Sequence, residues 1–228
     1  MLSAIDEDRI EAAVAKAEEG TSGEIVCVLA TEVATYREVP LAWAAAVALA
    51  LPPIALALGI VHPFSVMIGD AWMLAQPAAL ESDLGLALAA YATLQVVLFM
   101  IAALVVAIPE VRRRLTPPIL KRHRVAKAAH QQFAAISARA AGSETGILIF
   151  VALVDRQVQI LADAGIHQKV GEAAWTRAAN AIGAAMKGGH DPTGGIVEAV
   201  EICGAALKEH FPATEPRAHL FSSRPLEI

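Results

Sequence analysis

The chain has 228 residues, of which 56% are apolar, and a formal net charge of -5. This apolar content exceeds that of an ordinary soluble domain, so part of the chain is expected to lie in lipid. The 18 basic residues against 23 acidic ones argue against a nucleic-acid partner, because phosphate binding needs a basic face.

The first forty residues contain a predicted amphipathic helix and a predicted strand. Residues 3–19 repeat apolar side chains near helical spacing, between a serine cap and a glycine stop. This end lacks the basic and apolar regions of a cleavable signal peptide. The apolar run at residues 24–31 predicts a strand buried on both faces. It contains Cys27, which we expect, like Cys203, to be a buried thiol.

Two uncharged apolar stretches follow and predict a transmembrane hairpin over residues 41–109. The span at residues 84–108 has no charged residue and exceeds the length that a hydrocarbon layer of about 30 Å requires. The alternative interpretation of this stretch is a core helix of a soluble domain. The span at residues 41–61 is weaker, because Pro52 and Pro53 remove backbone donors near its middle and are expected to kink it.

Charge around the hairpin predicts its orientation. The connector at residues 62–83 has no lysine or arginine, whereas a basic flank follows the second span. The positive-inside rule places this flank, and with two spans both termini, in the cytoplasm. The connector is then outside, either in the outer headgroup region or as an ordinary exposed loop. The flank is also expected to attract anionic lipid headgroups, and its residues are Arg112, Arg113, Arg114, Lys121, Arg122 and Arg124.

The chain after the flank predicts a second set of α and β elements. The expected elements are a helix at 121–140, a fully buried strand at 146–154, a half-exposed strand at 157–163, and helices at about 171–187 and 193–210. With the hairpin treated as an insertion, residues 1–40 and 110–211 form one discontinuous α/β domain around a mixed sheet. Its first two strands are expected to be parallel and its third antiparallel. Residues 212–228 are expected to be a disordered tail.

Four pieces of the chain, in this order, resemble the TPM domain family in its bacterial, membrane-anchored branch: TSGEIVCVLA, RHRVAKAAHQQFAAI, ETGILIFVALVDRQVQILADAGI and GGHDPTGGIVEAV. The resemblance implies an α/β/α sandwich. With the orientation predicted above, this sandwich is expected at the cytoplasmic face of the bacterial inner (plasma) membrane. Members of this family have been linked to acid phosphatase activity, divalent cation binding and maintenance of membrane complexes. Asp163 departs from the pattern, because it stands where soluble relatives often have the first of two glycines.

Topology indicates which candidate site residues can meet. Glu24 and Asp163 are expected at one end of the sheet, where they either hold Ca²⁺ or Mg²⁺ or serve as caps and ion-pair partners. Asp155 and Arg156 are expected at the other end, beyond the carboxyl ends of the parallel strands. Open α/β sheets bind ligands there, so these two residues form either an anion site for a lipid headgroup or a solvated turn.

Two functions follow from these patterns. The favoured one is a non-enzymatic membrane factor that binds a cation or a partner and acts in assembly or maintenance of a membrane protein complex. The alternative is a metal-assisted phosphatase that activates water near Glu24 and Asp163. A pore is disfavoured, because neither predicted span carries an ionisable residue.

Overall fold

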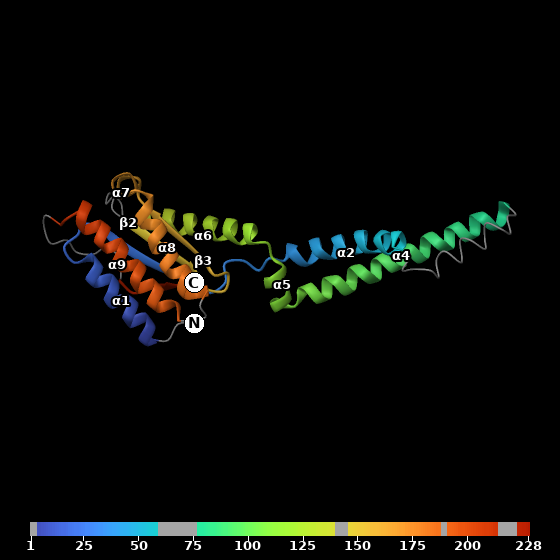
Figure 1. The fold of residues 1–228 in the computed structure, drawn as a ribbon, viewed down its shortest axis with the longest axis horizontal. Coiled ribbons are helices and arrows are strands. Elements are labelled where there is room, and N and C mark those ends of the chain that lie inside the picture. The colour runs from blue at the N-terminus through green and yellow to red at the C-terminus, as the bar shows by residue number, and fades with distance from the viewer. Residues whose placement is uncertain (1–3, 59–76, 140–145, 188–190, 214–222) are drawn as a thin grey trace. The chain divides into compact units, whose positions relative to one another are not determined.

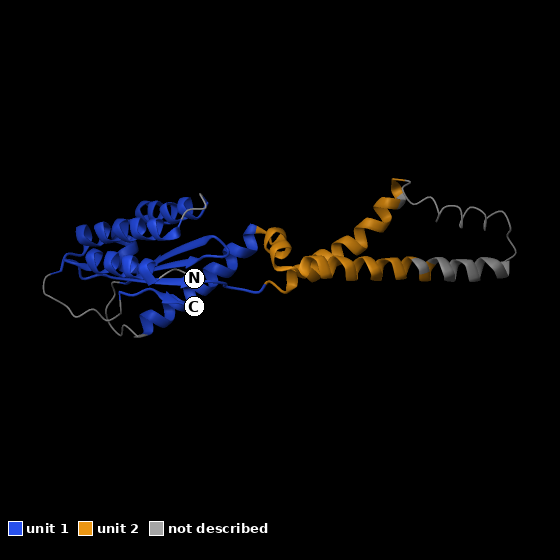
Figure 2. Ribbon diagram, turned by 90° about the horizontal axis from the view of Figure 1, so that it is seen from below, with its two compact units in different colours: residues 1–35, 118–228 blue, residues 36–117 orange. Residues whose placement is uncertain are grey.

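The computed structural model describes residues 4–58, 77–139, 146–187, 191–213 and 223–228. Residues 62–76 of the predicted connector lie outside the described residues. The chain divides into two compact units (Figure 2). Unit 1 combines residues 1–35 with residues 118–228, and unit 2 is residues 36–117.

Unit 1 is built on a four-stranded mixed sheet with the strand order β3-β2-β1-β4. β1 (Glu24–Ala30) and β2 (Gly146–Ala152) are parallel, and β3 (Gln157–Ala162) is antiparallel to β2. These directions confirm the mixed sheet expected from the sequence. The two parallel strands are buried on both faces, whereas β3 is half-buried at the edge of the sheet.

Three helices cover one face of the sheet (Figure 1): α1 (Ala4–Glu18), α8 (Glu172–Lys187) and α9 (Pro192–His210). Their apolar side chains pack with alternate residues of the parallel strands, such as Ile25 and Ile149, because successive strand residues point to opposite faces. Asp191 caps the start of α9, since its carboxylate accepts a 3.0 Å hydrogen bond from the backbone N–H of Thr193.

The opposite face of the sheet is covered by α6 (Pro118–Arg139). Val125 and Ala129 of this helix are fully buried and pack with Phe150 of β2 and Val26 of β1. Unit 1 therefore has a helix layer on each side of a central sheet.

Two glycines let residues 1–35 pack closely on α9. A Cβ atom at Gly204 would lie 2.6 Å from the Cβ of Ala17, and one at Gly23 would lie 2.6 Å from a Cδ of Leu207. The Nζ of Lys208 also donates a 3.0 Å hydrogen bond to the carbonyl oxygen of Lys16. The two stretches of chain thus share one tightly packed interface.

The last residues, 223–228, correct the prediction of a disordered tail for that end, whereas residues 214–222 lie outside the described ones. β4 (Leu226–Glu227) pairs in parallel with β1, and the N–H of Ile228 donates a 3.0 Å hydrogen bond to the carbonyl oxygen of Leu29. The outer edge of β1 otherwise leaves backbone polar groups to be satisfied, which favours even a short added strand. A 2.7 Å ion pair between Arg224 and Glu7 of α1 holds the same segment.

Unit 2 consists of α2 (Glu38–Ala57), α4 (Pro77–Ala107) and the short α5 (Pro109–Leu115). α4 starts earlier than the predicted span, so residues 77–83 are helical rather than part of a connector. Proline suits the first turn of a helix, and the alanines and leucine that follow Pro77 favour its continuation. By length and composition, unit 2 has one described helix that could cross a membrane, or two if α4 and α5 count together.

Candidate functional site

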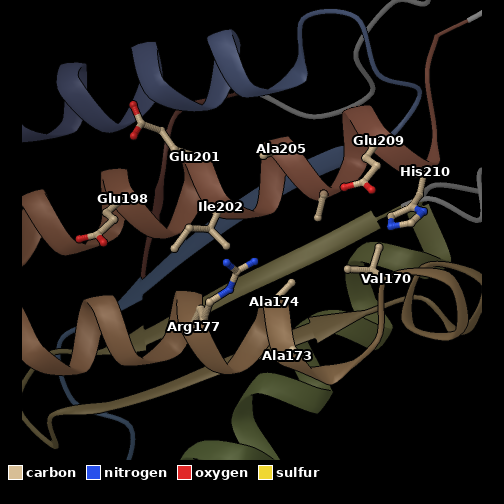
Figure 3. A pocket seen from close by; sticks show the side chains of 11 residues that line it. Val170, Ala173, Ala174, Arg177, Glu198, Glu201, Ile202, Ala205, Glu209 and His210 are labelled. Carbon is tan, nitrogen blue, oxygen red and sulfur yellow. The ribbon is translucent and has the colours of Figure 1, made fainter.

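An open groove of about 430 Å³ lies on the outer surface of unit 1 between α8 and α9 (Figure 3). The two helices approach closely at Gly195 of α9, where a Cβ atom would lie 2.8 Å from the Cβ of Ala185 and 2.9 Å from the carbonyl oxygen of Ala181. Small side chains continue along the groove, whose apolar lining includes Ala173, Ala174, Ala205 and Ala206. Small residues leave room for another surface to approach the two helix backbones.

The charged residues of the groove are mostly acidic. α9 contributes three carboxylates, from Glu198, Glu201 and Glu209, against one guanidinium, from Arg177 of α8 (Figure 3). Within the described part of the chain, none of these four side chains takes part in an ion pair. The groove therefore carries a net negative charge that attracts cationic groups.

Glu24 and Asp163 lie at the same end of the sheet, as the topology indicated. Glu24 is the register partner of Gly146, and the backbone N–H of Asp163 donates a 3.1 Å hydrogen bond to the carbonyl oxygen of Gly146. The Asp163 carboxylate in turn accepts a 2.7 Å hydrogen bond from the N–H of Gly146. It thus extends the β2–β3 pairing by one residue, immediately before α7 (Ala164–Val170), a helix that the sequence analysis missed.

These two acids alone would supply only part of a metal site. The described residues contain no group of three or more His, Cys, Asp or Glu side chains that could hold a metal ion. Ca²⁺ takes about six to eight oxygen ligands, so a cation at Glu24 and Asp163 would need water and backbone carbonyls for the rest. The proposed metal role of this pair stays a prediction.

Asp155 and Arg156 lie at the opposite end of the sheet, in the turn between β2 and β3. The Asp155 side chain is buried, which is at odds with a fully solvated turn. Arg156 is exposed and has a φ of 51°, a left-handed conformation that is uncommon for a residue other than glycine. The turn presents one exposed guanidinium, and its role as an anion site stays a prediction.

The predicted basic flank is divided between the two units. Arg112, Arg113 and Arg114 form the last turn of α5 in unit 2. Lys121, Arg122 and Arg124 belong to α6 of unit 1, which begins at Pro118. The flank is therefore two basic segments on two helices rather than one.

The α8–α9 groove is a feature that the sequence analysis missed. Its signal is the spacing along α9, where Glu198, Glu201, Ile202 and Ala205 recur every three or four residues and so share a face of the helix. That pattern is also what a solvent-exposed helix face looks like. Only the packing of α8 beside α9 turns this face into the wall of a groove.

Comparisons with known proteins support the fold. An NMR structure of the BA42 protein from the psychrophilic bacterium Bizionia argentinensis matches with a TM-score of 0.54 and 18% sequence identity, over 100% of this chain and 95% of that chain. No curated protein gave a significant match. The family model of the TPM domain matches residues 103–206, so the C-terminal part of unit 1, together with the end of unit 2, carries the TPM domain match.

Proposed function

We propose that this chain is a membrane-anchored protein whose α/β unit acts without catalysis as a binding module at the cytoplasmic face of the bacterial inner membrane. Unit 2 is the two-span anchor, and both termini are cytoplasmic. The α8–α9 groove binds a cationic segment of a membrane protein complex that the chain helps to assemble or maintain.

The observation that carries this proposal is the exposed apolar surface of unit 2. Large apolar side chains project outward along α2 and along the described part of α4. They include Leu41, Leu49, Leu51, Ile54, Val96, Val97, Met100, Ile101 and Leu104. In water such a surface would be costly, at roughly 25 cal/mol for each Å² of apolar area, whereas a bilayer covers it.

The low burial of α2 argues against a core helix of a soluble domain at this span. Only 28% of its apolar window, Glu38–Ala55, is buried inside the protein. A core helix with this composition would be mostly buried. The basic last turn of α5 and the acidic, lysine-free connector support the proposed orientation by the positive-inside rule.

A cationic partner fits the groove because its carboxylates have no ion-pair partners among the described residues. Exposed ion pairs contribute only about 0.2–1 kcal/mol each, so the groove is suited to a salt-sensitive, reversible interaction. The alanine lining adds apolar contact for the backbone or side-chain stems of the same segment.

Reversing two groove charges should release the partner. The Glu198→Lys/Glu201→Lys variant is expected to bind at least roughly 2- to 30-fold more weakly, because two pairs of this kind are lost. The measurement is quantitative co-purification from detergent, with the partner identified by mass spectrometry. Glu19→Lys/Glu32→Lys is the matched control, since both glutamates are exposed on unit 1 outside the groove. Equal loss of the partner in both variants would contradict a groove-specific interaction.

A second candidate, a metal-assisted phosphatase, is favoured by the position of Glu24 and Asp163 at one end of the sheet. Under this proposal both carboxylates hold the cation that activates water. The full-length protein with Mg²⁺, Mn²⁺ or Ca²⁺ should then hydrolyse a phosphomonoester, and Glu24→Gln/Asp163→Asn should abolish turnover. The amide introduced by Asp163→Asn keeps an acceptor for the Gly146 N–H, so the fold should persist. Turnover that survives in the folded double variant would exclude this site.

A further inference from the structure

The chain turns sharply where α4 ends. The segment Tyr91–Ala107 and α5 are bent by 96° across a single residue, Ile108. Ile108 has φ -60° and ψ 125°, an extended conformation, and Pro109 occupies the first turn of α5. Proline disfavours a helical conformation in the residue before it and lacks a backbone N–H, so the helix cannot continue through this point.

Hydrogen bonds fix the turned helix within unit 2. The indole N–H of Trp43 in α2 donates a 3.2 Å hydrogen bond to the carbonyl oxygen of Leu115, the last residue of α5. Thr116 is buried, and its hydroxyl and its backbone N–H both donate to the carbonyl oxygen of Arg112, at 2.7 and 2.9 Å. The bend is therefore held from α2 as well as from its own end.

The composition of the chain changes over a few residues on either side of this bend. Val105 and Ile108, which precede α5, are exposed apolar side chains, whereas Arg113 and Arg114 at its end are exposed and cationic. A helix at about a right angle to a membrane span lies along the membrane surface. Tryptophan is enriched at that level, which agrees with the position of Trp43 beside the end of α5.

We propose that α5 is an interfacial helix whose Arg113 and Arg114 bind the phosphates of anionic lipids in the cytoplasmic leaflet. This rests on the proposed insertion of unit 2 in a membrane. The rival arrangement, α4 and α5 as one broken span, would draw the last turn of α5 and its three arginines toward the hydrocarbon. The cost of an arginine grows with depth and reaches roughly 100-fold in insertion at mid-membrane, so the arginines favour the membrane surface. Guanidinium groups also match phosphate by bidentate hydrogen bonding as well as by charge.

The test compares lipid binding by the unmodified full-length protein and three variants of it in detergent. Native mass spectrometry measures the retention of phosphatidylglycerol and of phosphatidylcholine as each is titrated. Arg113→Gln/Arg114→Gln should weaken phosphatidylglycerol binding roughly 25-fold, about fivefold for each arginine, and leave phosphatidylcholine unchanged. Arg113→Lys/Arg114→Lys should keep most of the binding, because it keeps the charge.

The control variant is Lys16→Gln/Lys187→Gln, which removes two exposed positive charges from unit 1 outside the α8–α9 groove. It should bind phosphatidylglycerol like the unmodified protein. Equal binding by the Arg113→Gln/Arg114→Gln variant and this control would overturn the lipid site. Alkaline extraction of membranes separates this failure from that of the proposed anchor. An unmodified chain that is extracted would overturn both proposals, whereas one that stays in the membrane with unchanged lipid binding would overturn only the interfacial helix.

Discussion

An arginine at Leu49 is expected to prevent insertion of α2 and, as a consequence, assembly of unit 1. Leu49 lies near the middle of α2 and is 66% exposed, so under the proposed anchoring it faces lipid. The seven Leu, Ile and Val residues of α2 favour insertion by roughly 2–4 kcal/mol together, and an arginine at the centre costs about 2.5–3.5 kcal/mol. The substitution therefore removes most or all of the driving force.

The consequence for unit 1 follows from the chain order. With α4 as the sole remaining span, residues 1–35 and 118–228 would lie on opposite sides of the membrane. Neither stretch could then complete the sheet. Protease digestion of sealed vesicles measures on which side each stretch lies. One stretch should become protected while the other is cleaved, and unit 1 should lose the protease resistance of its folded state.

Leu41→Arg is the matched control for Leu49→Arg. Leu41 is 59% exposed but lies in the first turn of α2, where an arginine side chain can reach the membrane surface. This variant should integrate and fold like the unmodified chain. If both variants stayed in the membrane with unit 1 folded, α2 would not be a transmembrane span.

The sequence predicted the central sheet well, because its signals are local. The apolar runs at Glu24–Ala30 and Gly146–Ala152 have few alternatives to strands buried on both faces. Connection rules then set the directions of the strands, and with them the placement of Glu24 and Asp163 at the same end of the sheet. Composition likewise predicted that unit 2 is apolar, although its crossing of a membrane stays a proposal.

The features that the sequence did not predict depend on contacts between distant residues. β4 has only two residues and exists because β1 offers it an open edge. The end of α5 is fixed by Trp43, which lies 72 positions earlier in the chain. The α8–α9 groove exists because α8 and α9, which are separate in the sequence, pack side by side. No periodicity within a short window carries such information.

Removing residues 1–35 is expected to unfold the rest of unit 1. β1 lies between β2 and β4 in the sheet, so its loss leaves β4 without a pairing strand and β2 paired with β3 alone. Residues 1–35 also contribute six large buried side chains, namely Ile10, Val14, Ile25, Val26, Val28 and Leu29. Their burial contributes roughly 9–18 kcal/mol. This is comparable with the whole stability of a typical domain, about 5–15 kcal/mol.

The two cysteines report directly on whether unit 1 is folded, because each of its two stretches contains one. Burial raises the pKa of the Cys203 thiol to about 12. The pKa of the Cys27 thiol is raised more than that of Cys203, chiefly by burial and then by the proximity of Cys203 and Glu18. Because the thiolate is the reactive form, both thiols should be inert at neutral pH while unit 1 is folded. Unfolding returns them to ordinary reactivity.

The central claim is that two stretches of chain, separated by unit 2, build one cooperative fold. The most direct test is the rate of Cys203 alkylation at neutral pH in the fragment 118–228 and in residues 1–35 joined to 118–228 by a flexible linker. We predict that Cys203 is protected in the joined protein, whereas in the fragment alone it reacts as fast as in denaturant. A fragment that protects Cys203 and unfolds cooperatively by itself would contradict the claim.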